Sequence, residues 1–369
     1  MGASDKVALR YAEIFVSVFD GIAGDPSRPV MSGAAVPQCG AGGVAFRGSN
    51  ALMTSLVASQ RGFTVPVWLT RPKIQELGLR ILAGERNTPV VKYNIYYEDV
   101  RTGKPDPAMD DNIYRTLSDE ERKNWVKRCY MSAWPEFNIS QTNFAEVYPD
   151  QWAELVSEFG SPAVKADCPA LDRAVEEDGW LCPVRVSPEY GRMVYIEKND
   201  EIRCAPKASY PDQKRFYGDL AYVLSRSTGS EGRLDRDIQC PELEGVAREE
   251  LVSELAAATV ATLAGVSSCI QEHNLARLKG WVNAIGENPR VIFQAVTDAS
   301  SAAEMVSSTL ALEQRPGFSL DRLMEGVESA REFREKAQAR REARSAAVRA
   351  KHRKGWKPVK SPAKGGRHI

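Results

Sequence analysis

Histidine is scarce in this chain, with only His273, His352 and His368 among its 369 residues. No two of them are four residues apart, so the sequence lacks a His-Glu-x-x-His motif, in which two histidines on one helix face bind zinc and the glutamate activates water. A zinc hydrolase site of that type is therefore excluded. His273 stands alone among polar residues, a setting more typical of a surface or helix-capping histidine than of a metal ligand.

Closely spaced cysteines, long apolar runs and a leader-like beginning are missing as well. The seven cysteines are dispersed along the chain: Cys39, Cys129, Cys168, Cys182, Cys204, Cys240 and Cys269. Such a set predicts reduced thiols in a cytoplasm rather than disulfides or a zinc knuckle. No basic segment followed by an apolar run opens the sequence, and no apolar stretch approaches the length needed to span a membrane. We therefore expect a cytoplasmic protein without a membrane partner.

The formal net charge is zero, but the charges are unevenly distributed. Residues 1–150 carry 17 basic and 17 acidic side chains, residues 151–330 carry 18 and 29, and residues 331–369 carry 14 and 3. The hydrophobic fraction of 43% is enough to form ordinary cores. The length suits two domains with additions. A basic tail and an acidic second half attract each other unless nucleic acid competes for the tail.

The stretch from Phe46 to Tyr97 predicts a helix, an extended crossing, a short helix, a turn and a strand. Apolar residues at positions 52, 53, 56 and 57 lie on one face of a helix that follows Asn50. Thr70 is a candidate N-cap for a short helix that has Pro72 in its first turn and Gly78 just beyond its end. The β-branched and aromatic residues from 90 to 97 then favour a strand.

Positive charge and aromatic rings are interleaved in the same stretch. Residues 40–97 contain seven Lys or Arg and two acids, a net charge of +5. Trp68, Tyr93 and Tyr96 lie among these cations. Cations neutralise phosphates and rings stack on unpaired bases, so the pattern favours binding of a single nucleic-acid strand. It also fits a half-buried sheet face with solvated lysines.

The rest of the chain alternates between helical and strand patterns. A capping box at Ser118 and Glu121 predicts a helix to about Met131, with Trp125 and Val126 facing the core. Further helices are expected over residues 6–19, 149–159, 211–226, 247–264, 270–285 and 289–312. Short strands are expected over residues 184–186, 193–197 and 201–204, with a turn at Asn199-Asp200.

The order of residues in the first half is similar to that of a known family. The segments Phe46-Arg47-Gly48-Ser49-Asn50-Ala51-Leu52, Gly62 to Thr70, Gln75-Glu76-Leu77-Gly78 and Gly84 to Val91 resemble the N-terminal single-stranded-DNA-binding domain of the ArdC antirestriction family. Members of that family occur on conjugative plasmids, transposons and phages. The run from Phe137 to Asn143 resembles the end of the same domain. The resemblance implies a DNA-binding set of Arg47, Asn50, Trp68, Arg71, Lys73, Arg86, Lys92 and Tyr93.

The second half resembles the zincin-like metallopeptidase domain that follows in ArdC proteins. The similarity is carried by residues 216–220, 227–237 and 248–255. In that family a His-Glu-x-x-His helix precedes the Thr-Gly position, but here Tyr222-Val223-Leu224-Ser225-Arg226 takes its place. Glu254, or alternatively Glu250, matches the family's metal-binding acid. A catalytic zinc needs three protein ligands, so we expect no metal, no cofactor and no hydrolysis.

Without a metal, the vacated positions need another arrangement. We expect residues 216–226 to form an ordinary amphipathic helix with Leu220, Val223 and Leu224 facing inward. Arg226 would pair with Glu254 or Glu250, because a buried carboxylate needs a partner and a guanidinium matches its geometry. Tyr222 would add a hydrogen bond. The vacated metal site therefore consists of Tyr222, Arg226, Glu250 and Glu254.

These observations predict an α+β protein. Its expected parts are an ArdC-like α/β DNA-binding domain (1–150), a connecting segment (151–182), a mainly helical zincin-like domain with a small sheet and no His-Glu-x-x-His motif (183–318), a charged helix (319–350) and a basic disordered tail (351–369). The cations of residues 331–369 favour nucleic acid, although a solvated helix or a docking arm for an acidic partner would look the same.

Three functional classes remain open. The resemblance implies a single-stranded-DNA-binding accessory protein of a mobile genetic element, which shields incoming DNA from restriction and carries a catalytically dead zincin-like domain. The alternatives are a pseudo-enzyme scaffold with protein partners at the zincin-like domain, or a divergent metallopeptidase.

Overall fold

The structure is a computed structural model. It describes residues 3–31, 37–160, 167–176, 179–210, 212–236, 243–312 and 316–328, together with isolated positions between 330 and 343. Among these residues, no helix is both long enough and apolar enough to cross a membrane.

The first half of the chain combines a mixed sheet with helices on its flanks. Its helices are α1 (Ala3–Gly24), α2 (Gly48–Arg61), α3 (Arg71–Glu76), α4 (Asp111–Thr116), α5 (Asp119–Arg122), α6 (Phe144–Val147) and α7 (Pro149–Phe159), with a 3-10 turn η1 (Ile139–Gln141). Its strands are β1 (Cys39–Gly40), β2 (Val67–Thr70), β3 (Thr88–Asp99), β4 (Lys104–Pro105) and β5 (Trp125–Asn138). The strand order is β1-β2-β5-β3-β4, with β1 parallel to β2 and the other pairs antiparallel.

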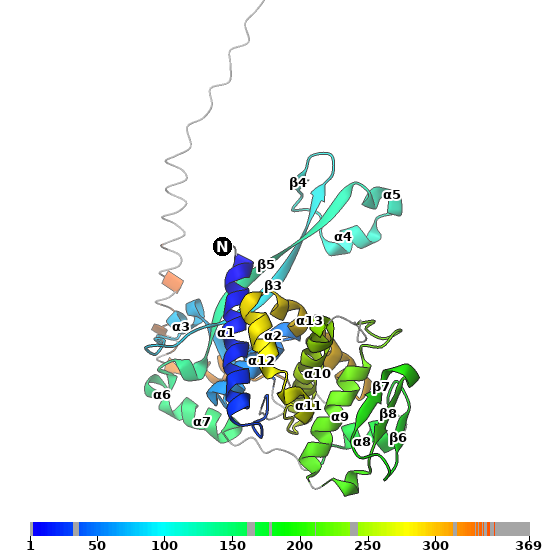
Figure 1. The fold of residues 1–369 in the computed structure, drawn as a ribbon. Helices are drawn as coiled ribbons and strands as arrows, with labels where there is room; N and C mark the ends of the chain where they lie inside the picture. Colours follow the sequence, from blue (N-terminus) through cyan, green and yellow to red (C-terminus); the bar gives the residue numbers. More distant parts are fainter. Residues whose placement is uncertain are drawn as a thin grey trace, which may run out of the picture.

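The two longest strands form a ribbon that leaves the body of the protein. β3 and β5 pair without interruption from Thr88 opposite Glu136 to Asp99 opposite Trp125. The far end of this ribbon carries β4, α4 and α5 and projects away from the helices (Figure 1). Near its base, β5 also pairs with β2, and helices α1 and α2 pack against the ribbon.

The second half is mainly helical with a small sheet at one side. Its helices are α8 (Pro169–Glu176), α9 (Gln213–Ser227), α10 (Leu243–Ala264), α11 (Glu272–Leu275), α12 (Leu278–Glu287), α13 (Val291–Thr309) and α14 (Leu320–Leu323), with 3-10 turns η2 (Glu197–Asn199) and η3 (Lys207–Ser209). The sheet has the order β6-β8-β7, from β6 (Val184–Val186), β7 (Val194–Ile196) and β8 (Glu201–Cys204).

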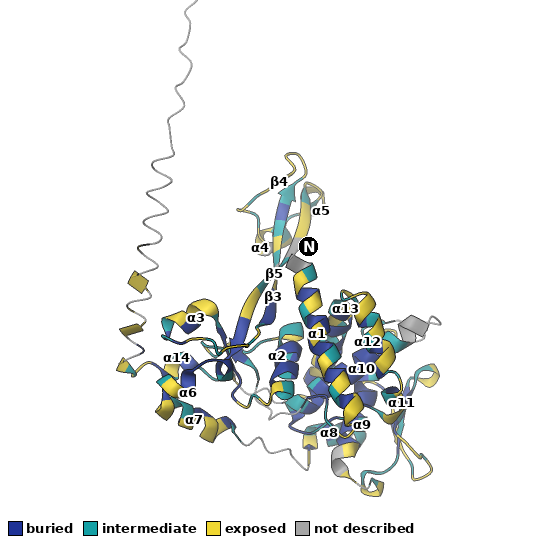
Figure 2. Ribbon diagram, turned by 60° about the vertical axis from the view of Figure 1, so that its left-hand side comes forward, coloured by how far each residue is buried: buried dark blue, intermediate teal, exposed yellow. Residues whose placement is uncertain are grey.

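One large apolar core joins the two halves. Helix α1 packs against α12 and α13, where Phe19 lies 5.6 Å from Trp281 and Tyr11 lies 5.4 Å from Phe293 between ring centroids. The buried residues of α2 belong to the same core. Figure 2 shows buried residues concentrated in α1, α2 and α10 and at the base of the ribbon, while α5 at its far end is exposed.

A second core ties the end of the described chain to the first half. Residues 316–328, here called the return segment, lie against β1 and the loop that follows it. Cys39 Sγ donates to the carbonyl oxygen of Phe318 at 3.2 Å, and Lys73 Nζ pairs with Asp321 at 2.7 Å. Gly317 is so close to Gly43 that an added Cβ would meet its carbonyl oxygen at 2.4 Å.

The α+β class and most of the expected elements are confirmed. Thr70 caps α3 by accepting from the Lys73 amide at 3.3 Å, and Gly78 follows with φ +67. The inward positions Leu220, Val223 and Leu224 of α9 are all buried.

Three expected helices are wrong in their extent. The Ser118–Glu121 capping box forms, but its helix ends at Arg122, and Trp125 and Val126 begin strand β5 instead. A capping box specifies where a helix begins and not how long it is, and the β-favouring residues that follow pair with β3. The expected helix 270–285 is split into α11 and α12, and the Asn274 side chain of α11 donates to Glu254 and Tyr222. The charged helix expected from 319 is interrupted, because α14 ends at Leu323 and a turn follows it. Residues 344–350 and the tail 351–369 lie outside the described residues.

Candidate functional site

One face of the β3/β5 ribbon carries both cations and aromatic rings. Cross-strand pairing places Lys92 opposite Ser132, Tyr96 opposite Arg128 and Val90 opposite Trp134, and residues two apart share a face. Trp134 is 56% exposed, and Lys92 and Arg128 are also exposed. Lys92, Tyr96, Arg128 and Trp134 of this row, without the buried Val90, are called the ribbon face below.

Trp134 was missed by reasoning from the sequence. It lies close to the stretch that was expected to be helical, so its alternation with Ser132 along a strand was not considered. The signal that would have found it is the strand pattern itself, since β-favouring residues run from Trp125 to Phe137.

Trp68 is not available for base stacking, which corrects its expected role. Its side chain is 0% exposed, its indole N–H donates to Gln38 Oε1 at 2.7 Å, and its ring meets Phe63 edge-on. The reason is the position of β2 between β1 and β5, which makes it an internal strand. The exposed indole of the first half is Trp134 instead.

Arg47 and Asn50 lie at the start of α2 and have different environments. Arg47 is the exposed N-cap residue of the helix, and no side chain caps it. The side-chain amide of Asn50 forms two hydrogen bonds with the backbone of β3. Its Nδ2 donates to the Val91 carbonyl oxygen and its Oδ1 accepts from the Val91 N–H, both at 2.8 Å. Asn50 therefore positions the strand that carries Lys92.

The remaining expected DNA-binding cations are partly neutralised. Arg71 is exposed, with its guanidinium 5.2 Å from the centre of the Phe137 ring. Lys73 pairs with Glu76 at 2.7 Å as well as with Asp321. Arg86 pairs with Glu13 at 2.8 Å. The side chain of Tyr93 lies outside the described residues.

The vacated metal site is a buried polar cluster between α9, α10 and α11. Glu254 is 1% exposed, and its Oε1 accepts from the Gln271 amide at 2.9 Å and from Asn274 Nδ2 at 2.8 Å. The same Asn274 Nδ2 lies 3.2 Å from the Tyr222 hydroxyl, and Glu250 pairs with Arg277 at 2.5 Å. The structure thus brings Tyr222, Glu250 and Glu254 into one region, as expected.

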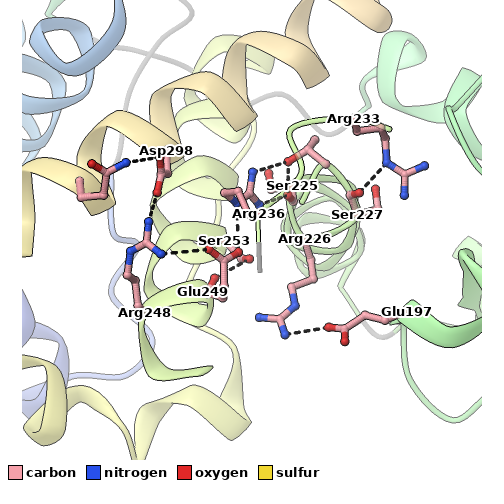
Figure 3. Close-up of polar contacts among 12 residues, drawn as sticks. Glu197, Ser225, Arg226, Ser227, Arg233, Arg236, Arg248, Glu249, Ser253 and Asp298 are labelled. Carbon is pink, nitrogen blue, oxygen red and sulfur yellow. Dashed lines mark hydrogen bonds and ion pairs between the residues drawn. The ribbon is translucent and has the colours of Figure 1, made fainter. Parts of the chain in front are cut away.

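Arg226 has a different partner from the one expected. Its Nη2 donates to Glu197 Oε1 at 2.9 Å, and Figure 3 shows its side chain reaching toward the β7–β8 connection. Glu254 Oε2 has no hydrogen-bond partner among the described residues. The predicted Arg226–Glu254 pair is therefore replaced by an ion pair with a residue of the small sheet.

Burial changes the protonation of this cluster. Desolvation raises the pKa of Glu254 to about 8, and the Asn274 and Gln271 donors offset only part of that effect. Desolvation also raises the pKa of Glu250, against the lowering effect of Arg277 and Arg226. Glu254 is therefore a neutral carboxyl group at pH 7.

The residues present do not fit a zinc ion. Zinc needs three or four N, S or O donors around one point, and the described residues contain no group of three His, Cys, Asp or Glu that could hold a metal. The Tyr222 phenol and the Arg226 guanidinium occupy the two positions one turn apart on α9. The neighbouring Glu254 carboxyl group accepts a hydrogen bond from the Asn274 side-chain amide. The arrangement holds Glu254 Oε1 with two N–H donors, while Glu254 Oε2 and Asn274 Oδ1 have no hydrogen-bond partner in the part of the chain that the structure describes.

Two arginines from the segments that resemble the zincin-like domain, Arg236 and Arg248, hold neighbouring elements together. Arg236 pairs with Glu249 at 3.0 Å in a setting where both side chains are almost fully buried, and its Nη1 donates to Thr228 Oγ1 at 3.0 Å. Arg248 pairs with Asp298 (Figure 3). These contacts fix the loop after α9 to α10 and α10 to α13.

Comparison with protein families identifies both halves. The model of the N-terminal domain of the anti-restriction factor ArdC matches residues 20–134, and a zincin-like metallopeptidase model matches residues 182–298. The chain is an ArdC-like protein.

Solved structures share the fold of this ArdC-like protein. Two crystal structures of the antirestriction protein ArdC from plasmid R388, one metal-free and one with Mn(II) bound, match with TM-scores of 0.57 and 0.54. They are 24% and 23% identical, and the match covers 82% and 80% of this chain and 99% and 98% of theirs.

Among curated proteins, the chain is similar to two primases that are several times longer and to one uncharacterised protein. Two DNA primase TraC proteins of Escherichia coli are 27% identical over 308 residues and 26% identical over 292 residues, and each match covers 79% of this chain. This chain spans 25% and 18% of their lengths. The uncharacterised protein y4eC of Sinorhizobium fredii is 22% identical over 274 residues, covering 73% of this chain and 80% of that protein.

Proposed function

We propose that this ArdC-like protein binds single-stranded DNA as a cytoplasmic accessory factor of a mobile genetic element. Protection of incoming DNA from restriction would be its cellular role. The relatives named antirestriction protein and DNA primase support a connection with DNA. The cysteines whose side chains the structure describes, Cys39, Cys168, Cys182, Cys204 and Cys269, are free thiols, which suits a reducing compartment.

The observation that carries the proposal is the ribbon face. It presents the exposed Trp134 indole beside Lys92, with Tyr96 and Arg128 further along the same two strands. A flat face that joins rings for stacking with cations for phosphates suits an unpaired strand, whose bases are free to stack. A duplex hides its bases, so it would use only the cations.

The proposal is tested by fluorescence anisotropy with matched single- and double-stranded oligonucleotides at two salt concentrations. Trp134→Ala should weaken single-strand binding by about 1–3 kcal/mol if one base stacks on the indole. Trp125→Ala is the matched control, since Trp125 lies on the same strand but nine residues away and therefore on the other face. Equal affinity for duplex and single strand, or equal effects of the two variants, would contradict the proposal.

The zincin-like domain, in this proposal, is not a peptidase. Tyr222 and Arg226 replace the two histidine positions, and the Glu254 carboxyl is neutral and hydrogen-bonded by Asn274. Metal analysis of the purified protein should find no stoichiometric zinc. Stoichiometric zinc that is lost in Glu254→Ala would instead favour a divergent metallopeptidase.

A protein partner at the zincin-like domain is a second candidate function. Strand β6 lies at the edge of the small sheet, and Leu181 and Val186 beside it are 46% and 45% exposed. An exposed edge strand with apolar neighbours is suited to pairing with another chain. Val186→Lys should abolish such an interaction without changing oligonucleotide affinity.

A further inference from the structure

A cleft of about 540 Å³ opens between the two halves of the protein. Its walls come from the loop before α2 and the first turns of that helix on one side, and from α10 and α13 on the other. The return segment closes one end with Pro316 and Gly317. This volume lies within the range of pockets that hold small organic groups.

The α10 and α13 wall is rich in hydrogen-bond acceptors. Thr259 and Thr262 each donate their hydroxyl proton to a carbonyl one turn earlier at 2.8 Å, and Ser300 and Ser307 do the same at 2.7 and 2.6 Å. A hydroxyl whose proton is used in this way retains its lone pairs for another donor. The carboxylate of Glu304 adds an exposed acceptor on the same side.

The opposite wall is suited to an aromatic ring and a phosphate. Phe46 is half-buried in the wall, and Arg47 beside it is exposed. The N-terminus of α2 has no side-chain cap and no acid in its first turn, so its amides and Arg47 favour a negative charge. An added Cβ at Gly48 would meet nothing within 4 Å, which leaves the backbone open to a ligand.

Asn50 connects this wall with the ribbon. It follows Arg47 by three residues and holds the backbone of Val91, the residue before Lys92. Val91 is buried with α2, so the side chain of Lys92, one residue later, lies on the opposite face of β3. A bound strand would therefore pass around the edge of β3 that Asn50 holds to reach the cleft.

We propose that the cleft holds one nucleobase of the bound strand, with Arg47 and the start of α2 on its phosphate and Phe46 beside the base. This inference rests on the proposed single-strand binding and extends it to a specific pocket. The acceptor-rich wall selects a base with an exocyclic amine, which adenine, cytosine and guanine carry and thymine lacks. The remaining bases of the strand stack on the ribbon face without selection.

The test uses an all-thymine oligonucleotide and the same oligonucleotide with one central 2-aminopurine, a fluorescent base that carries an exocyclic amine. Anisotropy with the all-thymine strand measures binding by the ribbon alone. Acrylamide quenching of the 2-aminopurine then reports whether that base is buried in the complex. We expect several-fold protection from the quencher and about tenfold tighter binding of the 2-aminopurine strand, within the range for one ordered base.

Two neighbouring serines provide a matched pair of variants. Ser300 lines the cleft and Ser301 does not, yet both lie on α13 and donate to the carbonyl four residues earlier. Ser300→Leu should fill the cleft, remove the protection and leave all-thymine binding unchanged. Ser301→Leu should behave as wild type. If Ser300→Leu does not fold, Thr262→Val keeps the side-chain volume, removes one acceptor and should reduce the preference for the amine-bearing base.

The outcomes separate this inference from the proposed function. Binding without protection, or equal protection in Ser300→Leu and wild type, would overturn the pocket while single-strand binding stands. An unchanged base preference in Thr262→Val would overturn the role of the acceptor wall. Failure to bind either strand would refute the proposed function itself.

Discussion

The β3/β5 ribbon and the polar cluster between α9 and α10, counted here with the neighbouring Arg236–Glu249 pair, hold charged side chains in opposite environments. On the ribbon, Lys92 and Trp134 face solvent. In the cluster, Glu249 and Glu254 are 0% and 1% exposed. Exposed polar and aromatic groups contribute little to stability and remain available for a ligand, whereas buried polar groups need partners within the fold. The ribbon is therefore the region to test for binding, and the cluster is the region to test for stability.

The two tryptophans give the largest contrast. Trp68→Ala removes a fully buried indole, and we expect the free energy of unfolding to fall by about 3–5 kcal/mol. Trp134→Ala should change it by less than about 0.5 kcal/mol, because that ring lies at the surface. Urea unfolding followed by circular dichroism measures both. Comparable losses in the two variants would mean that Trp134 is packed and not free to stack.

The buried ion pair of the cluster should also be sensitive to single substitutions. Arg236→Met leaves the buried Glu249 with only the more distant Arg248, at 4.0 Å, and a loss of up to about 3–5 kcal/mol is expected. Replacing both residues, as Arg236→Met with Glu249→Leu, should cost much less, because no unpaired charge remains. Arg80→Met is the surface control, since Arg80 and Glu146 are 64% and 61% exposed and such pairs contribute about 1 kcal/mol or less. A double variant as unstable as the single one would contradict this account.

The cluster should make stability depend on pH, with a sign opposite to that of a paired surface carboxylate. The pKa of Glu254 is raised from 4.5 to about 8 in the folded protein, so between these values the folded state binds a proton that the unfolded state has lost. Stability should therefore fall as pH rises through this window, by up to about 1.4 kcal/mol per pH unit. Glu254→Gln keeps a neutral side chain and should remove this slope.

The comparison of slopes isolates Glu254 from other groups. Glu136 at the base of the ribbon also has a pKa raised by burial, to about 7, and it contributes a slope in both proteins. The difference between wild type and Glu254→Gln in urea titrations at pH 5 to 8 is therefore the quantity to measure. Parallel profiles would show that Glu254 is ionised in the folded state.

The smallest expected effect concerns the basic tail, and it stays a prediction because residues 344–369 lie outside the described part of the chain. Residues 331–369 carry 14 cations and 3 acids, so deleting them should flatten the dependence of log affinity on log salt. The preference for single strands should remain, because the ribbon face is intact. An unchanged slope would assign the tail to another partner.

The local structure of this protein followed closely from sequence patterns. Strand β8 was expected over residues 201–204, and α7 over 149–159, and both have those bounds. The cap of α3 by Thr70 depends on neighbouring residues only. The helix expected after Ser118 failed because partners distant in sequence decide whether β-favouring residues extend into a sheet.

The candidate site was harder to derive, because its residues depend on contacts between distant segments. Arg47 and Lys92, both expected to bind DNA, are exposed, whereas Asn50 of the same set holds β3 through Val91. Trp134 was overlooked because a helix was expected up to Met131, whereas strand β5 runs through it from Trp125 to Asn138. The partner of Arg226 was also unpredictable, since Glu197 approaches it only after the small sheet packs beside α9.

By itself, the sequence determined the two-part family, the absence of a histidine pair for zinc, the helix caps and the placement of most helices and strands. These depend on residue identity, on order and on interactions within a few residues. Only the tertiary structure decided which indole is buried, which acid meets Arg226 and where the cleft opens. Each of these depends on which distant segments pack together, because burial and ion pairing arise from the relative placement of whole elements.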